Sequence, residues 1–172
     1  MADRPSLIVY LDTSILLAWL GDEERDGDEM AGVYECFDRI RKGEIQAIVS
    51  SLFRTEIDID QFDAEKRADF FSLLSERNPL EVTLENRVCK LAGEIRWHFR
   101  KDGKRIETPD ALHLAAAIHH DASEFYVFDR GVEGKRASLL DLSGELCGHS
   151  LSILHPPVLR PQFDFRKKGG DG

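Results

Sequence analysis

The hydrophobic residues of the chain fall into short continuous runs and longer segments with helical spacing. The first run, residues 7–11 (LIVYL), lacks the alternation of a half-exposed strand and is typical of a strand buried on both faces of a parallel sheet. Further short runs predict strands at 44–50, 79–83, 124–129 and 151–156. Helical spacing predicts helices over 14–20, 30–43, 63–78, 84–105 and 108–122, and a helix that opens within 50–57 with Ser50 or Ser51 as its N-cap.

These strands and helices alternate along the chain. Alternation of this kind predicts an α/β fold, a three-layer α/β/α sandwich with a mostly parallel central sheet. The length of 172 residues suits one domain with a complete core. We therefore predict one domain over residues 1–155 and a C-terminal extension over 156–172, whose prolines and terminal glycines favour a mobile or partner-ordered segment.

A single carboxylate interrupts the apolar N-terminal segment. Asp12 stands directly after the first predicted strand, within the sequence SLIVYLDTSILLAWL. Burial of an unpaired carboxylate costs several kcal/mol or forces it to take up a proton. In open α/β sheets the ligands bind at the carboxyl ends of the strands. Asp12 is therefore a candidate for contact with a cation.

Three more acidic residues are predicted at the same edge of the sheet. In a parallel α/β sheet the helices run back against the strands, so helix N-termini lie where strands end. Glu56 lies in the first turns of the helix after the second strand, and Asp110 begins the helix at 108–122. Asp129 ends the strand at 124–129. Four acids from distant parts of the chain are thus expected to converge.

Asp110 lies at a well-marked helix start, TPDALHLAAA. Thr108 suits the N-cap position, and Pro109 suits the first helical position, where its missing N–H costs nothing. The helix dipole helps to keep Asp110 ionised. Acids in first turns also stabilise helices without any further role, so both interpretations of Asp110 alone stay open.

Clustered carboxylates repel one another. At ~4 Å and an effective dielectric constant of about 20, two like charges cost about 4 kcal/mol, so such a cluster takes up protons or cations. Ligand sets made only of oxygen favour hard ions such as Mg²⁺ or Mn²⁺. One or two such ions activate water and neutralise a phosphodiester during in-line displacement. The hypothesis from these residues is metal-dependent phosphodiester hydrolysis.

The composition restricts the binding partners and the cell compartment that are compatible with this chemistry. The net charge of −9 repels polyanions, so binding of nucleic acid would need a local basic patch or metal ions. Three widely spaced cysteines without a CxxC pair predict reduced thiols in a cytoplasmic protein, in place of a disulfide framework or a zinc site. The N-terminal run has no basic n-region and contains Asp12, so it predicts neither a signal peptide nor a membrane span.

One segment, residues 96–105, combines cations with aromatic side chains. Its cations are Arg96, Arg100, Lys101, Lys104 and Arg105, and its aromatic residues are Trp97 and Phe99. Basic groups hold phosphates and aromatic rings stack on splayed bases, which suggests an RNA-binding face. The alternative is a helix C-terminus whose cations complement the dipole while the aromatic residues enter the core. Both interpretations stay open.

A histidine follows Asp110 on the same side of its helix. His113 is three residues further along, which places it near the acidic edge as a candidate catalytic group. A histidine in such a place more often packs or forms a local hydrogen bond. The sequence leaves this choice open.

With these residues in view, the chain resembles the PIN-domain family, and within it the VapC-like toxin ribonucleases of toxin–antitoxin pairs. The resemblance rests on YLDTS, SSLFRTE, TPDALHLAAA and FDRG, and on the combination of an early LDTS with a late DALHLA. It implies that the catalytic and metal-binding quartet is Asp12, Glu56, Asp110 and Asp129. Ser14 and Thr108 would support it, with Ser14 helping to hold a ligand or water. One departure is Val127, where family members often carry Thr or Ser.

The resemblance also implies function and partners. Family members cleave RNA endonucleolytically with Mg²⁺ or Mn²⁺, usually dimerise, and in toxin pairs are inhibited by a cognate antitoxin. The alternatives are a non-toxin PIN nuclease in RNA processing and a degenerate PIN fold that serves as a protein-binding module. Retention of all four acids argues against the degenerate fold, because without metal they would destabilise the site. A phosphoacceptor signalling module needs an acceptor Asp at the end of the third strand and a Lys at the end of the fifth. It is disfavoured, because the third-strand segment PLEVTLEN has no Asp and the last predicted strand ends at His155 in place of a Lys.

Overall fold

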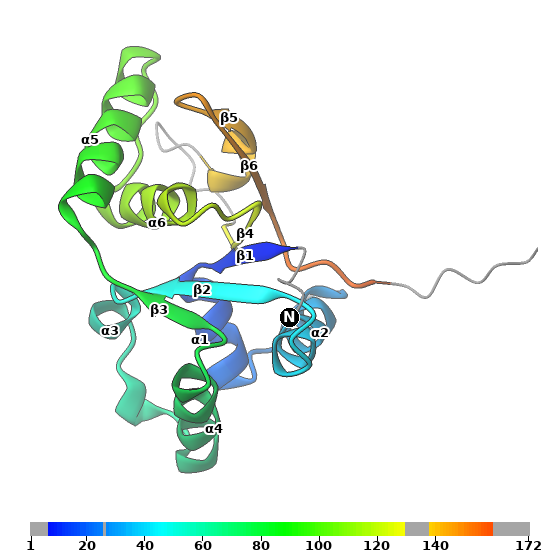
Figure 1. Cartoon of the computed structure of the whole chain (residues 1–172). Coiled ribbons are helices and arrows are strands. Elements are labelled where there is room, and N and C mark those ends of the chain that lie inside the picture. The colour runs from blue at the N-terminus through cyan, green and yellow to red at the C-terminus, as the bar shows by residue number, and fades with distance from the viewer. Residues whose placement is uncertain (1–6, 26, 130–137, 160–172) are drawn as a thin grey trace, which may run out of the picture.

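The computed structural model describes residues 7–25, 27–129 and 138–159. Within them one sheet has the strand order β3-β2-β1-β4-β6-β5 (Figure 1). The strands are β1 (Ile8–Leu11), β2 (Gln46–Ser50), β3 (Leu80–Val82), β4 (Glu124–Tyr126), β5 (Gly144–Leu146) and β6 (His149–Leu154). Neighbouring strands pair in parallel except β5, which pairs antiparallel with β6 at the edge. The sequence did not predict β5, because its three residues, GEL, carry no apolar run.

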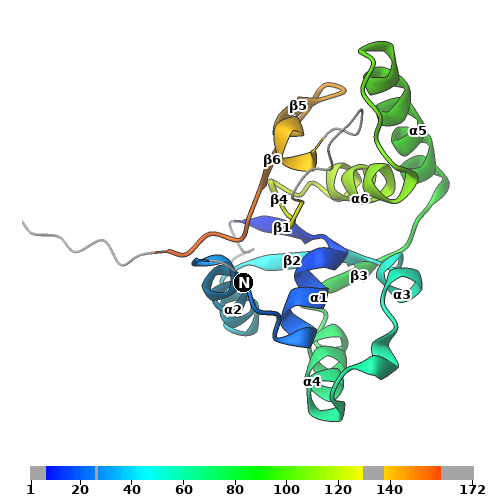
Figure 2. The ribbon, with the colours of Figure 1, turned by 180° about the vertical axis from the view of Figure 1, so that it is seen from behind.

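Helices cover both faces of this sheet. They are α1 (Thr13–Gly21), α2 (Glu29–Arg41), α3 (Phe53–Glu56), α4 (Ala64–Ser75), α5 (Asn86–Lys101) and α6 (Thr108–His119), with 3₁₀ turns η1 (Ile59–Gln61) and η2 (Leu139–Leu142). One face packs against α1, α2 and α4, and the opposite face packs against α5 and α6 (Figures 1 and 2). The predicted three-layer α/β/α sandwich with a mostly parallel sheet is therefore confirmed.

Strand β1 lies at the centre of both cores. Val9, Tyr10 and Leu11 are at most 1% exposed. Val9 and Leu11 pack among the residues of α1 and α2, whereas Tyr10 packs among those of α5 and α6 and stacks on Phe125 of β4. The continuous apolar run is thus explained by burial of both strand faces, as predicted.

The segment after β2 is shorter and differently capped than predicted. Helix α3 has a single turn, and Leu52 occupies its N-cap position without a side-chain cap. The prediction of Ser50 or Ser51 as N-cap is wrong, because Ser50 ends β2 and the Ser51 N–H extends the pairing to β3 by donating to the Val82 carbonyl. Extended backbone at Ile57 ends α3, so Glu56 is its last residue.

The chain beyond β6 follows helix α2. The backbone N–H of Leu159 donates to Oε2 of Glu35 at 3.0 Å. A Cβ built on Gly32 would lie 2.0 Å from the carbonyl oxygen of Pro156, so this crossing requires a glycine in the helix. The rest of the predicted C-terminal extension, 160–172, lies outside the described residues.

Among the helices of the described ranges, none is long and apolar enough to cross a membrane.

Candidate active site

The turn from β1 into α1 positions the first acid. Asp12 is 8% exposed and is the N-cap of α1, with its Oδ1 accepting the backbone N–H of Ser14 at 2.8 Å. Its own N–H donates to the Tyr126 carbonyl, which ties it to the end of β4. The carboxylate therefore lies at the carboxyl edge of the sheet, beside the positive end of a helix that stabilises its charge.

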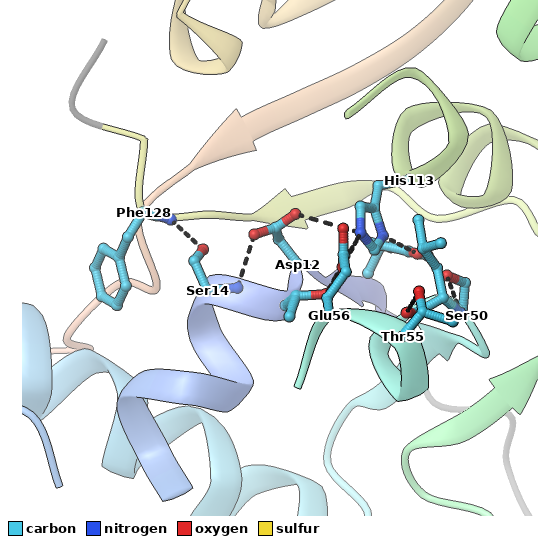
Figure 3. A network of polar contacts seen from close by, with 10 residues as sticks. Asp12, Ser14, Ser50, Thr55, Glu56, His113 and Phe128 are labelled. Carbon is cyan, nitrogen blue, oxygen red and sulfur yellow. Dashed lines mark hydrogen bonds and ion pairs between the residues drawn. The ribbon is translucent and has the colours of Figure 1, made fainter. Parts of the chain in front are cut away.

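The second acid approaches from α3. Oε2 of Glu56 accepts a hydrogen bond from the Thr13 hydroxyl at 2.5 Å and lies 2.9 Å from Nε2 of His113 (Figure 3). The residues Thr13 and Glu56 come from α1 and α3, and His113 comes from α6, so three separate elements meet at one carboxylate oxygen.

His113 forms the centre of this group. Its ring is 2% exposed, and its Nε2 lies 4.0 Å from Oδ2 of Asp12 and 3.4 Å from the Thr13 hydroxyl. On its other side, Nδ1 shares a 2.8 Å hydrogen bond with the hydroxyl of Tyr10 on β1. The buried imidazole thus has a polar partner at each ring nitrogen, which fixes its orientation.

Electrostatics favour an ionised pair. Burial acts to lower the pKa of His113, but the hydrogen bond to Glu56 and the charges of Asp12, Glu56 and Asp110 raise it above the usual 6.5. For Glu56, burial acts to raise the pKa, but hydrogen bonds from His113 and Thr13 and the charge of His113 lower it below 4.5. The neighbours of each group therefore favour its charged form, an imidazolium at His113 and a carboxylate at Glu56.

The remaining predicted acids are placed differently. Asp110 is half-buried in the first turn of α6, and its charge acts on His113 one turn later. Asp129 lies beyond the end of β4, and its Oδ2 accepts the backbone N–H of Leu139, which fastens β4 to η2. The structure thus brings Asp12 and Glu56 to His113, with Asp110 one helical turn before that residue on α6, whereas the contact described for Asp129 is with η2.

Two predicted supporting residues have backbone roles. Ser14 Oγ accepts the N–H of Phe128 at 2.9 Å, joining the start of α1 to the end of β4 (Figure 3). The predicted N-cap at Thr108 is wrong: Glu107 is the extended N-cap residue of α6, and Thr108 is already helical. Val127, the residue that departs from the family pattern, is 2% exposed and belongs to the core.

Sequence reasoning underestimated the neutral polar residues of this site. Tyr10 and Thr13 flank the first acid, but Tyr10 is indistinguishable from a core aromatic residue in the apolar run. Burial raises the pKa of Tyr10 far above its usual value although a hydrogen bond with Ser50 lowers it, so its hydroxyl stays protonated. The signal that the sequence offered for Tyr10 was its hydroxyl group, on the face of β1 that packs against α6.

The donor atoms of the cluster suit a hard divalent ion in type. Asp12, Glu56 and Asp110 offer carboxylate oxygens, which Mg²⁺ and Mn²⁺ prefer. Within the described residues, no three acidic, histidine or cysteine side chains already form a group that could hold a metal ion. In this arrangement Nε2 of His113 lies 2.9 Å from Oε2 of Glu56.

The cations predicted to bind RNA lie on α5 and in the loop after it. Arg96, Arg100, Lys104 and Arg105 line a groove of about 550 Å³ together with Trp97. Lys101 Nζ lies 5.4 Å from the centre of the Trp97 ring. Phe99 is buried in the core, so of the two aromatic residues only Trp97, at 58% exposed, faces solvent.

Comparisons with known proteins agree with this fold. Chains of similar structure occur in VapBC2 from Rickettsia felis bound to a promoter DNA fragment (15% identity, 86% of this chain and 98% of that chain, TM-score 0.57) and in FitAcB from Neisseria gonorrhoeae (17%, 72% and 88%, 0.50). Another occurs in DNA-bound VapBC from Salmonella typhimurium, with 12% identity, coverage of 86% of this chain and 98% of that chain, and a TM-score of 0.50. No curated protein sequence matches significantly. The family model of the PIN domain matches residues 9–136, most of the 172 residues. The chain therefore belongs to the PIN domain family.

Proposed function

We propose that this protein is an endoribonuclease that uses Mg²⁺ or Mn²⁺ to hydrolyse RNA phosphodiester bonds, and that it is the toxin of a type II toxin–antitoxin pair. The observation that carries the proposal is that Asp12 and Glu56 meet at His113, with Asp110 one helical turn before it on α6, at the carboxyl edge of the parallel sheet. Ligand sites of open α/β folds lie at this edge. Membership of the PIN domain family supports the nuclease assignment.

The residues of the cluster have distinct roles in this proposal. Asp12, Glu56 and Asp110 would hold the divalent ion, with Asp129 at the rim as the fourth acid. When bound, the ion supplies activation of water and neutralisation of the phosphodiester charge. Thr13 and His113 hold the Glu56 carboxylate by hydrogen bonds, and Ser14 fixes the turn that carries Asp12 by binding the Phe128 N–H. The half-buried site lowers the local dielectric, which strengthens each of these interactions.

We also propose protein partners. The similar chains come from the VapBC2, VapBC and FitAcB structures, of which the VapBC2 and VapBC structures are described as bound to DNA, and this supports a cognate antitoxin for this chain. We propose that the toxin acts in the cytoplasm and forms a homodimer. Co-purification checks the antitoxin partner, and size-exclusion chromatography with light scattering checks the homodimer.

The deciding experiment maps RNA 5′ ends after brief expression from an inducible promoter. The parent protein is compared with Asp110→Asn and with Asp121→Asn, an exposed acid beyond the C-terminus of α6. New ends made by the parent and by Asp121→Asn, but not by Asp110→Asn, would establish a nuclease that depends on the acidic cluster. Equal ends in all strains, at equal protein levels, would favour a binding-only PIN fold.

A second experiment tests the metal with purified protein. RNA that carries the mapped cut site is incubated with Mg²⁺, with Mn²⁺, or with EDTA. We expect cleavage with either ion and none in EDTA. Cleavage in EDTA that persists in the variants Asp12→Asn and Asp110→Asn would overturn the metal-dependent mechanism.

A further inference from the structure

A groove separate from the acidic cluster gathers positive charge on a protein that is acidic as a whole. One face of α5, at positions 93, 96, 97 and 100, and the loop at 103–106 enclose about 550 Å³. Four cationic side chains line it, although the net charge of the chain is −9. Among these four side chains, Arg105 forms an ion pair with Glu107 at 3.2 Å. The groove therefore carries local positive charge suited to an anionic ligand.

The groove also presents an aromatic surface. Trp97 is 58% exposed, whereas the other tryptophan, Trp19, is 2% exposed and stacks on Phe37. Lys101 lies over one part of the Trp97 ring, with Nζ 5.4 Å from the ring centre. Buried residues of α5, among them Ile95 and Phe99, hold the helix against the core, so Trp97 lies on the exposed side of the helix. An exposed indole among cations suits ligands that carry both phosphates and planar bases.

A glycine keeps the floor of the groove open. Gly93 lies inside α5 one turn before Trp97, and a Cβ built there would meet no atom within 4 Å. Packing therefore does not require glycine, although glycine weakens a helix interior relative to alanine. Without a side chain at this position, a ligand can approach the helix backbone closely.

The loop that lines the groove continues along the chain into the helix that carries Asp110. Gly103 adopts a positive φ of 72° and turns the chain back after α5, and the loop then enters α6, whose first turn carries Asp110. Lys104 and Asp110 are separated by six residue steps. Such a segment spans at most about 20 Å, which a bound strand of a few nucleotides covers.

We propose that this groove binds the single-stranded RNA that enters the acidic cluster, with Arg96, Arg100, Lys104 and Arg105 on its phosphates and Trp97 stacked on a base. The proposal rests on the proposed ribonuclease function. An acidic protein segment would satisfy the cations equally well, but it offers no planar bases for the exposed indole and the guanidinium groups. The stacking surface therefore favours RNA.

Tryptophan fluorescence provides the first test, because Trp97 is the accessible one of two tryptophans. A 12-nucleotide single-stranded RNA is titrated into the full chain in EDTA, which separates binding from cleavage. We expect saturable quenching that is absent in Trp97→Phe. Unchanged emission at RNA concentrations that saturate binding, measured by anisotropy of labelled RNA, would overturn the stacking role of Trp97.

Charge variants test the phosphate contacts. Arg100→Gln with Lys104→Gln is compared with Arg41→Gln with Lys42→Gln, a matched pair at the end of α2 on the other face of the sheet. We expect the groove variant to bind RNA at least about tenfold more weakly, with a salt slope smaller by about 1.4, since each contact on a single strand contributes about 0.7. The α2 variant should bind as the parent does. Equal affinities for both variants would overturn the proposal.

Two further outcomes separate this proposal from the proposed function. A parent chain that binds RNA through the groove but cleaves none, with Mg²⁺ or Mn²⁺ present, would support the groove and remove the nuclease. A parent chain that cleaves RNA while the groove variant binds and cleaves it equally well would support the nuclease and remove the groove. A parent chain that binds a poly-glutamate peptide but no RNA, with peptide binding lost in the groove variant alone, would overturn the proposal. It would assign the groove to a protein partner.

Discussion

Nε2 of His113 lies 2.9 Å from Oε2 of Glu56, so that a buried imidazole on α6 holds the carboxylate at the end of α3. The same ring nitrogen lies 4.0 Å from Oδ2 of Asp12. Asp12 and Glu56, two acids that would repel one another, therefore both lie beside one buried imidazole. This arrangement determines how the metal-free protein should respond to pH, to mutation and to added ions.

The first prediction concerns stability against pH in EDTA. Folding raises the pKa of His113 above 6.5 through the Glu56 hydrogen bond and nearby acids, so its contribution is full below 6.5 and is lost as the pH rises through the folded pKa. Folding lowers the pKa of Glu56 below 4.5, so its contribution is full above 4.5 and is lost as the pH falls through the folded pKa. The His113–Glu56 pair should therefore stabilise the folded protein most between pH 4.5 and pH 6.5.

Urea unfolding of the parent and of His113→Gln, at intervals from pH 4 to pH 9, checks this prediction. Glutamine keeps a donor for Glu56 but has no charge to lose, so the decline above about pH 6.5 should be smaller in the variant. Parallel stability curves for the two proteins over this range would show that folding does not raise the pKa of His113.

A second prediction concerns the far side of the imidazole. Tyr10→Phe removes the hydroxyl that bonds Nδ1 of His113 and leaves a buried polar atom without its partner. We expect a loss of about 1–3 kcal/mol in the free energy of unfolding, and slower RNA cleavage because Glu56 is held less firmly. Tyr126→Phe removes a hydroxyl that bonds Glu124 elsewhere in the sheet and should leave cleavage unchanged. Equal cleavage by Tyr10→Phe and the parent would contradict the role of this contact.

A third prediction separates the helix-capping role of Asp12 from its proposed catalytic role. Asparagine also caps helices well, so Asp12→Asn should unfold within about 0.5 kcal/mol of the parent, whereas Asp12→Ala should lose about 1 kcal/mol with the bond to the Ser14 N–H. Both variants should lose RNA cleavage. Thermal unfolding and a cleavage assay on the same samples check the two effects. Retained cleavage in Asp12→Asn would show that only the cap matters.

Added metal provides a fourth prediction. An ion that binds only the folded protein stabilises it by about 2.7 kcal/mol at a hundred times its dissociation constant. We expect Mn²⁺ to raise the melting temperature of the parent, and to do so much less for Asp110→Asn, because one of the proposed ligands loses its charge. Asp121→Asn, with an exposed acid outside the cluster, should respond as the parent does. An equal rise in all three proteins would place the metal elsewhere.

Two helix-interior glycines provide a matched pair for the fifth prediction. Gly32→Ala would drive a Cβ into the carbonyl of Pro156 and should lose about 1–3 kcal/mol of stability. Gly93→Ala meets open space and should gain about 0.5–1 kcal/mol from the better helix former. Chemical unfolding of both variants measures the difference. A gain for Gly32→Ala would mean that the segment after β6 does not pack on α2.

Much of the fold was predictable from local patterns. The buried strand at 7–11, the alternation of strands with helices and the placement of Asp12, Glu56 and Asp110 at one sheet edge all follow from residue spacing and from the rule that parallel strands end together. Failures occurred where pairing between distant segments overrides local preference. Ser50 and Ser51 suit an N-cap by type, yet they serve β2 and its pairing with β3.

What the sequence by itself determined is therefore the fold class and the residues available for chemistry, because both depend on short-range periodicity and on residue type. The tertiary structure alone decided the partners of those residues. His113 looks like an ordinary helix histidine three positions after Asp110, and it became the centre of the site because β1, α1 and α3 approach α6 there. Such choices depend on contacts between residues far apart in sequence, which no local pattern encodes.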